Sequence, residues 1–180
     1  VGHTLMFGPT GSGKSTHLAV LAAQLRRYPG MTLFAFDKGL SLYPLVSAVH
    51  ASTGGSSGLH FAVAGDGARA FAPLQFLSTR ADRAWAMEWI DLLLGLNDLR
   101  TTPDQRNEIA RAILNMHETG SRSLTDLALT LQDTGMRAVL EQYTVRGSMG
   151  HLLDASEDGL ELSDFTVFEV EELMALGDRF

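Results

Sequence analysis

Cysteine is absent from the 180 residues of this chain. The absence excludes disulfide bonds, thiol nucleophiles and thiolate metal ligands, and it is compatible with a reducing cytosol. Long apolar runs are also missing, because no stretch reaches the roughly 18 consecutive apolar residues that a membrane-spanning helix needs. We therefore expect no membrane-spanning segment, and the hydrophobic content of 45% is ordinary for a globular domain.

Positive charge is scarce, with 14 lysines and arginines against 21 acidic residues and a net charge of −7. This balance gives no direct signal of nucleic-acid binding. Histidines are few and scattered, and none of the six lies four residues from another. The spacing therefore predicts no histidine metal site.

One motif stands out against these absences. The stretch FGPTGSGKST, residues 7–16, fits the pattern G-x-x-x-x-G-K-[ST] of a phosphate-binding loop. Glycines allow successive backbone N–H groups to turn inward as an anion nest, and a following helix adds the partial positive charge of its N-terminus. We assign nucleotide binding to Gly8, Pro9, Thr10, Gly11, Ser12, Gly13, Lys14, Ser15 and Thr16.

Three side chains of this loop have distinct predicted roles. Lys14 brings a full positive charge to the β- and γ-phosphates, which makes it a candidate catalytic residue. Ser15 offers its hydroxyl to Mg²⁺, and Thr16 is expected near the α-phosphate. The predicted ligands are therefore ATP and Mg²⁺. A solvated glycine-serine linker is the alternative, but an apolar strand before the loop and an amphipathic helix after it favour phosphate binding.

The N-terminal region of the sequence predicts an α/β unit. Residues 3–7 form an apolar run typical of a buried parallel strand, 14–27 a helix, and 31–36 a second buried strand. This order predicts a parallel sheet with a right-handed crossover. A short helix over 40–51 and a third strand over 59–64 follow.

The middle of the sequence predicts helices. Three capping boxes, each a hydroxyl followed three residues later by an acid or amide, open helices at about 80–96, 103–118 and 124–132. A fourth helix is expected over 136–143. A glycine-rich link over 147–150 then leads back to the α/β region.

The end of the sequence returns to the α/β pattern, with a strand over 165–170 and a helix that begins at residue 171. We therefore expect an α/β core over 1–78, an all-α insertion over 79–146 and the returning core over 147–180, together a fragment of a longer chain.

Two acids could serve nucleotide hydrolysis at the ends of predicted strands. Asp37 ends the apolar stretch LFAFD, and an acid leaving a strand beside the loop strand points to the phosphate side of the sheet. It is our second candidate catalytic residue, the alternative being a turn-forming Asp-Lys-Gly. Glu169, in FTVFE, is expected to face solvent. Neither fits the metal-holding acid well, so we expect that acid beyond Phe180.

Two further features of the helical region have competing interpretations. Trp85 and Trp89 are four residues apart, which favours a helix core or interface stripe over a platform for stacked bases. Arg80 and Arg83 could act as an arginine finger on a neighbouring subunit, but a solvated helix start is the simpler interpretation.

Several stretches together resemble one family, the conjugal-transfer ATPases of type IV secretion systems, known as the CagE/TrbE/VirB component family. The stretches, in order, are GHTLMFGPTGSGKST, FAFDKG, SLYPL, FAPL, RAWAMEWI, QRNEIARAI, RSLTDL and GHLLDASEDGLELSDFTVFEVEELM. The resemblance covers essentially the whole chain, and its TrbE-like branch is the most similar. Asp37 lies in the FDKG-like strand-end motif.

The resemblance implies a P-loop NTPase domain of RecA-like fold with an all-α subdomain. It also implies a homo-oligomer, typically a hexamer, on the cytoplasmic side of the bacterial inner membrane, where it contacts other secretion components. ATP hydrolysis in this family supports pilus biogenesis and substrate transfer. The metal-holding acid, its neighbouring glutamate and the N-terminal domain are not in this sequence, so hydrolysis by this segment alone is not expected.

Three other functions stay open from the residues alone. A RecA-like DNA-translocating motor would need a basic surface toward DNA. A nucleotide or small-molecule kinase would use Asp37 to accept a hydroxyl proton and the helical region as a lid. A non-hydrolysing assembly module would bind nucleotide only to stabilise an assembly.

Overall fold

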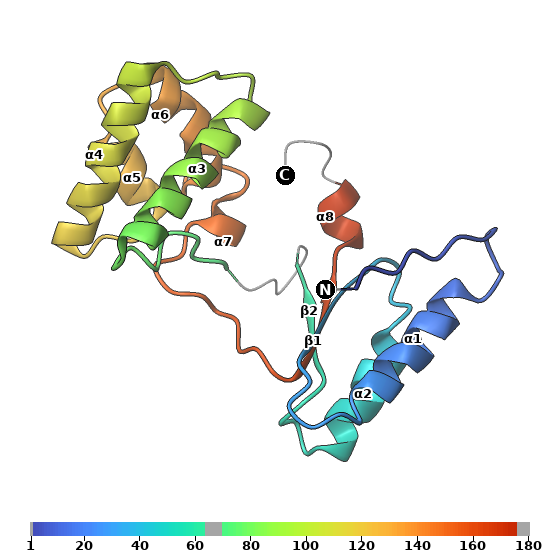
Figure 1. The fold of residues 1–180 in the computed structure, drawn as a ribbon. Coiled ribbons are helices and arrows are strands. Elements are labelled where there is room, and N and C mark those ends of the chain that lie inside the picture. Colours follow the sequence, from blue (N-terminus) through green and yellow to red (C-terminus); the bar gives the residue numbers. More distant parts are fainter. Residues whose placement is uncertain (1, 64–69, 176–180) are drawn as a thin grey trace. The chain divides into compact units, whose positions relative to one another are not determined.

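A computed structural model describes residues 2–63 and 70–175 of the chain. These residues form two compact units, coloured by sequence in Figure 1: an α/β unit of 2–63 with 161–175, and a helical unit of 70–160. Each unit has a hydrophobic cluster of its own. Each is therefore described by itself.

The α/β unit is built on a three-stranded parallel sheet in the order β1-β3-β2. β1 (Leu33–Asp37) and β2 (Leu59–Ala62) both pair with β3 (Phe165–Glu169), which is buried along its whole length. A central parallel strand is covered on both faces, which explains its unbroken burial. The predicted α/β class with a parallel sheet is confirmed.

Helices flank the strands of this unit. α1 (Lys14–Leu25) follows the glycine-rich loop, α2 (Tyr43–Ser52) follows β1, and α8 (Glu171–Ala175) follows β3. The core joins α2 to the sheet, with Val46 and Val49 packed in one cluster with Phe165 and Val167 of β3. The sheet and α2 thus fix the carboxyl ends of β1 and β3, where the candidate acids lie.

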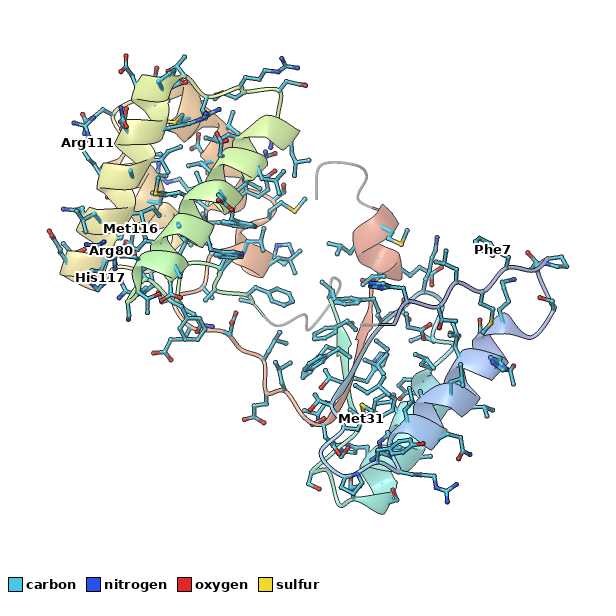
Figure 2. The ribbon with its side chains drawn as sticks, in the orientation of Figure 1. Phe7, Met31, Arg80, Arg111, Met116 and His117 are labelled. Atoms are coloured by element: carbon cyan, nitrogen blue, oxygen red, sulfur yellow. The ribbon has the colours of Figure 1, made fainter. Side chains whose placement is uncertain are left out.

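The predicted strand over 3–7 is wrong. Residues 2–9 form no regular element, and Leu5 and Phe7 are exposed, Phe7 to 86% of its surface (Figure 2). An apolar run becomes a buried strand only when another strand pairs with its backbone and a layer covers its side chains. The described residues supply neither for this segment.

The helical unit contains the predicted helices and one more. Its elements are α3 (Arg80–Leu96), α4 (Pro103–Thr119), α5 (Leu124–Thr130), α6 (Thr134–Leu140), the 3₁₀ turn η1 (Glu141–Tyr143) and α7 (Gly150–Leu153). The helix α7 was not predicted; it begins at Gly150, the last residue of the predicted glycine-rich link. Among the described residues no helix combines the length and the apolar content needed to cross a membrane.

The three predicted capping boxes are all present. In each one the hydroxyl at the cap accepts the backbone N–H three residues on, while that residue's side chain accepts the N–H of the cap. The pairs are Thr79 with Asp82, Thr102 with Gln105, and Ser123 with Asp126. Local chemistry therefore sets where α3, α4 and α5 begin.

Segments on both sides of the predicted insertion lie with the helical unit. Leu74 and Leu77, which precede α3, are fully buried in its core, and the Phe71 N–H donates to the Leu152 carbonyl at 2.6 Å. The helical unit therefore extends from residue 70 to residue 160, which is longer at both ends than the predicted all-α insertion over 79–146.

Candidate functional site

The glycine-rich loop has the backbone conformation that an anion nest requires. Gly11 and Gly13 have φ angles of 82° and 84°, in the left-handed region that residues with a Cβ rarely adopt. Left-handed residues alternating along a loop turn consecutive N–H groups to one side. Gly13 also caps α1, and no side chain caps that helix, so the N–H groups of its first turn stay open to a ligand.

Gly8 lies close to the Ser12 side chain within the loop. A Cβ at this position would lie 2.7 Å from the Ser12 hydroxyl oxygen, closer than atoms of this kind pack. The Ser12 N–H donates to the Pro9 carbonyl at 3.2 Å, which folds the loop back on itself. A side chain at position 8 would therefore require the Ser12 hydroxyl to move.

Lys14 is held by the loop it follows. Its Nζ donates to the carbonyl oxygens of Gly8, at 2.7 Å, and of Pro9, at 2.9 Å. No carboxylate among the described residues pairs with this ammonium, so only carbonyl dipoles offset its charge. Ser15 and Thr16 are exposed beside it on the first turn of α1. The arrangement offers an anion one full charge and two hydroxyls.

Asp37 is buried at the end of β1, with 6% of its surface exposed. Its Oδ1 accepts from the Ser41 hydroxyl, and its Oδ2 accepts from the Leu42 N–H at 2.7 Å. Leu42 is the residue that caps α2. Asp37 therefore fixes the start of α2, and no hydrogen bond or ion pair of the described residues joins it to the loop.

Glu169 does not face solvent as predicted. Only 9% of its surface is exposed, and its carboxylate accepts the N–H groups of Leu40 at 2.7 Å, Glu171 at 3.0 Å and Gly39 at 3.2 Å. The prediction is wrong because β3 is the central strand of the sheet and all five of its residues are buried.

The turn after β1 contains strained backbone. Gly39 and Leu40 have φ angles of 82° and 58°, and for leucine a left-handed conformation costs about 1–2 kcal/mol. Hydrogen bonds to both acids hold this turn, since Glu169 accepts the N–H groups of its middle and Asp37 accepts the N–H at its end. Strain that persists because its surroundings fix it is common at functional sites.

The described residues hold no group of three or more His, Asp or Glu side chains placed to bind a metal ion. The roles of Ser15 toward Mg²⁺ and of Lys14 and Asp37 in catalysis stay predictions.

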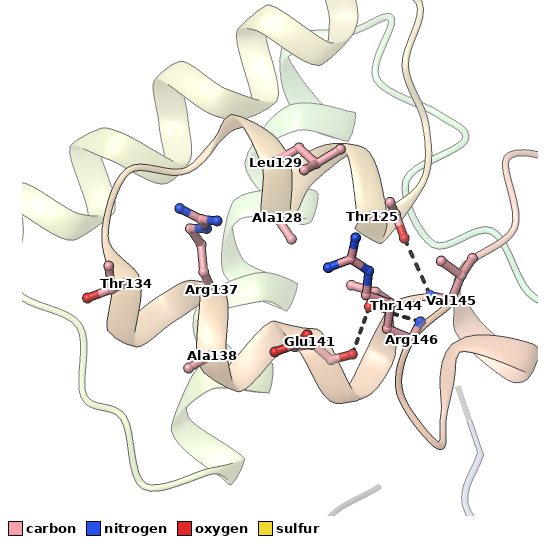
Figure 3. A pocket seen from close by; sticks show the side chains of 10 residues that line it. All are labelled: Thr125, Ala128, Leu129, Thr134, Arg137, Ala138, Glu141, Thr144, Val145 and Arg146. Atoms are coloured by element: carbon pink, nitrogen blue, oxygen red, sulfur yellow. Dashed lines mark hydrogen bonds between the residues drawn. The ribbon is translucent and has the colours of Figure 1, made fainter.

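A concave surface lies in the helical unit. A cavity of about 340 Å³ is lined by Arg137 of α6 and Arg146 of the loop after η1, and Figure 3 shows both side chains. Neither guanidinium has a partner among the described residues. Sequence reasoning missed this pair because the two arginines belong to different elements. Arg83, by contrast, donates to the carbonyls of Leu77 and Ser78 and so fixes the start of α3.

Proteins with conjugal-transfer names are similar to almost the whole chain. A probable conjugal transfer protein TrbE from Sinorhizobium fredii is 48% identical over 99% of this chain. The conjugal transfer protein TrbE of Rhizobium radiobacter is 49% identical over the same share. The chain covers 27% and 22% of these two relatives, about a quarter of their length.

More distant relatives carry the name VirB4. A type IV secretion system protein virB4 from Bartonella henselae is 26% identical over 97% of the chain. The solved structure of VirB4 of Thermoanaerobacter pseudethanolicus matches 96% of the chain and 50% of its own, with a TM-score of 0.68 and 15% identity, which shows a shared fold. No protein-family model matches the sequence. The resemblance inferred from the motifs is confirmed, since the chain is a relative of TrbE and VirB4 proteins.

Proposed function

We propose, from its kinship with TrbE and VirB4 proteins, that this chain is the ATP-binding segment of a type IV secretion or conjugal-transfer ATPase. The observation that supports this most is the position of Lys14 at the loop. Its Nζ donates hydrogen bonds to the carbonyl oxygens of Gly8 and Pro9. Lys14 is the first residue of α1, and no side chain caps the N-terminus of that helix. A lysine, a glycine loop and a helix N-terminus in this order suit a polyphosphate.

The residues present fit the triphosphate of ATP. Gly8 and the left-handed Gly11 and Gly13 keep parts of the loop backbone free of Cβ atoms, so phosphate oxygens can approach N–H groups closely. Lys14 would stabilise their negative charge, and Ser15 would bind Mg²⁺. ATP itself would supply a phosphoric anhydride whose hydrolysis releases free energy.

The longer protein would supply the rest of the activity. We propose that it is a P-loop NTPase of RecA-like fold, assembles as a homo-oligomer such as a hexamer, and works with other secretion components on the cytoplasmic side of the inner membrane. Its ATP hydrolysis would energise pilus biogenesis and substrate transfer. The names of the relatives support these proposals, and residues outside this chain would complete the catalytic set.

Asp37 would act in that assembly by holding the turn after β1. Its carboxylate binds Ser41 and Leu42, and it ends a strand at the edge of the sheet where parallel α/β proteins bind their ligands. Its catalytic role remains our proposal, to be tested in the full-length protein.

The decisive experiment measures binding of a fluorescent ATP analogue with Mg²⁺ to this chain and to its Lys14→Ala variant. We expect the variant to lose about tenfold or more in affinity, since a hydrogen bond to a charged partner contributes about 1.5–3 kcal/mol. Arg27→Ala is the matched control, because it removes one positive charge beyond the far end of α1. Equal affinity of Lys14→Ala and the unaltered chain would reject the proposed site.

The DNA-translocating alternative has one observation in its favour. Arg137 and Arg146 line a cavity without carboxylate partners, and guanidinium groups bind phosphates well. Binding of DNA that weakens with salt and is lost in Arg137→Ala would favour that alternative. Phosphorylation of a small acceptor would instead favour a kinase.

A further inference from the structure

Aromatic side chains gather along one open groove of the helical unit. The groove has a volume of about 680 Å³, and we call it the tryptophan groove; its principal residues are Phe71, Phe76, Asp82, Trp85, Trp89 and Asp158. Trp85 and Trp89 of α3 stack with their rings 6.1 Å apart and 8° from parallel. Trp85 is 52% exposed and Phe76 is 70% exposed. Trp85 therefore presents its ring to solvent, whereas Trp89 packs against the core of the helical unit.

Exposed aromatic surface of this kind is a sign of binding. Large apolar side chains gathered in a concavity mark ligand or protein sites more often than stray surface residues do. Tryptophan is also enriched among the residues that contribute most to protein interfaces. The kind of partner then depends on the charges of the groove.

The charged side chains that the structure describes in the tryptophan groove are acidic. Asp82 and Asp158 line it, and among the described residues of its lining there is no lysine, arginine or histidine. Asp158 is held in place, since it accepts the Ala72 N–H at 2.6 Å and the Gln75 side-chain amide. Asp82 accepts the Thr79 N–H at 2.8 Å, and that hydrogen bond lowers the pKa of its carboxyl group. Both groove carboxylates are thus fixed, and Asp82 stays ionised at neutral pH.

We propose that the tryptophan groove binds a cationic segment of a partner protein, with an arginine or lysine side chain against the exposed ring of Trp85 and its charge near Asp82 and Asp158. A cation over an indole face is attracted by the ring, and a nearby carboxylate adds to that attraction. Arginine fits best because its planar guanidinium stacks on an aromatic ring while it donates to carboxylates.

Charge decides between this partner and a nucleic acid. A platform for stacked bases needs a positively charged groove that follows the phosphates, and the tryptophan groove carries the opposite sign. The neighbouring Arg83 is not among the residues that line the groove, and its guanidinium is directed to the carbonyls of Leu77 and Ser78. The tryptophan groove therefore favours a basic protein segment over a nucleic acid.

The chain offers a direct reporter for the test. It contains two tryptophans, and both line the tryptophan groove, so intrinsic tryptophan fluorescence reports on this site alone. The probe is a short capped peptide of alternating arginine and glycine, added to the whole chain at low ionic strength. We expect a saturable change in tryptophan emission. The matching glutamate-glycine peptide and a short oligodeoxythymidylate should cause none.

Variants then locate the contact, with anisotropy of a labelled arginine peptide as the readout. Trp85→Ala should weaken binding about tenfold, as loss of a cation–π contact of intermediate strength implies. Asp158→Asn should weaken it about threefold, as expected for an exposed charge pair. Glu88→Gln, on the same helix but outside the tryptophan groove, is the matched control and should bind like the unaltered chain.

Circular dichroism confirms that each variant is folded before its affinity is compared. Failure of the arginine peptide to bind would overturn the proposal. Equal binding of the glutamate peptide, tighter binding of the oligonucleotide, or undiminished binding by both Trp85→Ala and Asp158→Asn would also overturn it. None of these outcomes depends on ATP, so the result is independent of the proposed nucleotide site.

Discussion

Asp37 and Glu169 lie opposite each other in register at the carboxyl ends of β1 and β3, and their carboxylates hold one turn between them. Glu169 accepts the N–H groups of Gly39 and Leu40, while Asp37 accepts that of Leu42. Two neighbouring acids thus fix the chain where it leaves the sheet. At this edge, Asp37 has both a structural role and a proposed catalytic one.

Glu169→Gln should destabilise the chain. The carboxylate accepts three backbone N–H groups, and an amide in its place would turn its own N–H₂ toward at least one of these donors. A buried donor without a partner costs about 1–3 kcal/mol, so we expect the free energy of unfolding in urea to fall by about that amount. Glu172→Gln, an exposed acid of α8, is the control and should change stability little.

Leu40→Gly should stabilise the chain slightly. The change relieves about 1–2 kcal/mol of strain at a φ of 58°, while the greater freedom of glycine in the unfolded chain offsets about 0.4–1 kcal/mol. The net gain, about 0.5–1 kcal/mol, would appear as a higher melting temperature. A lower melting temperature would contradict the left-handed conformation of Leu40.

Features set by neighbouring residues could be predicted from the sequence. The helix starts at Thr79, Thr102 and Ser123 depend on hydrogen bonds across three residues, and all three boxes formed as predicted. The glycine pattern of the loop is equally local, since a left-handed φ at Gly11 and Gly13 needs no distant partner.

Features that depend on distant partners could not be predicted in this way. Exposure of Phe7 reflects a missing strand neighbour among the described residues, which an apolar run by itself does not reveal. Burial of Glu169 follows from its central place in the sheet, which needs the strand order. The cavity of Arg137 and Arg146 forms only when α6 and the loop after η1 pack together.

Gly13→Ala should disrupt the loop. A Cβ at a φ of 84° costs about 1–2 kcal/mol, and relaxation of the backbone would move the N–H groups of the first turn of α1. We expect weaker binding of the fluorescent ATP analogue together with lower stability. Gly95→Ala is the control, because Gly95 lies in α3 with open space around it. That change should raise stability by up to about 1 kcal/mol and leave nucleotide binding unaltered.

Asp133→Asn should change how stability depends on pH. The Met136 N–H and then the Gln105 side chain lower the pKa of the Asp133 carboxyl group in the folded chain. A folded pKa below the unfolded value of about 3.9 gives stability that is present above that pH and is lost as pH falls through the folded pKa. Asparagine caps α6 without a charge.

Urea unfolding at several pH values therefore tests this prediction. The unaltered chain should be more stable than Asp133→Asn at neutral pH, and the two should converge as the pH falls below about 4. Glu157→Gln, which removes an exposed carboxylate, controls for net charge. A difference that is constant across this range would mean that the charge of Asp133 does not contribute.

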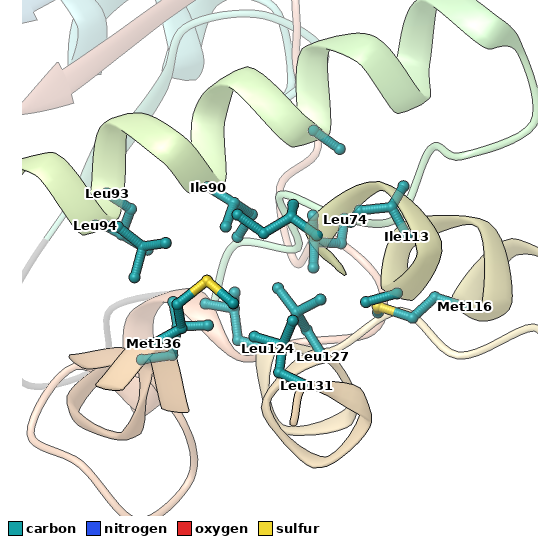
Figure 4. Packing of buried hydrophobic residues seen from close by; sticks show 14 of the residues in the cluster. Leu74, Ile90, Leu93, Leu94, Ile113, Met116, Leu124, Leu127, Leu131 and Met136 are labelled. Carbon is teal, nitrogen blue, oxygen red and sulfur yellow. The ribbon is translucent and has the colours of Figure 1, made fainter. Parts of the chain in front are cut away.

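Leu127→Ala should strongly destabilise the helical unit. Leu127 of α5 is fully buried among leucines, isoleucines and methionines from α3, α4 and α6 (Figure 4). Truncation to alanine at such positions costs about 2–5 kcal/mol, because it removes apolar contacts and leaves a cavity. Leu129→Ala, two residues along the same helix but exposed, should change stability by less than about 0.5 kcal/mol.

Tryptophan fluorescence follows the helical unit during urea unfolding, since Trp85 and Trp89 both belong to it. Equal midpoints for the two variants would contradict the packing of α5, whereas a midpoint lowered only in Leu127→Ala would show that this core stabilises the unit.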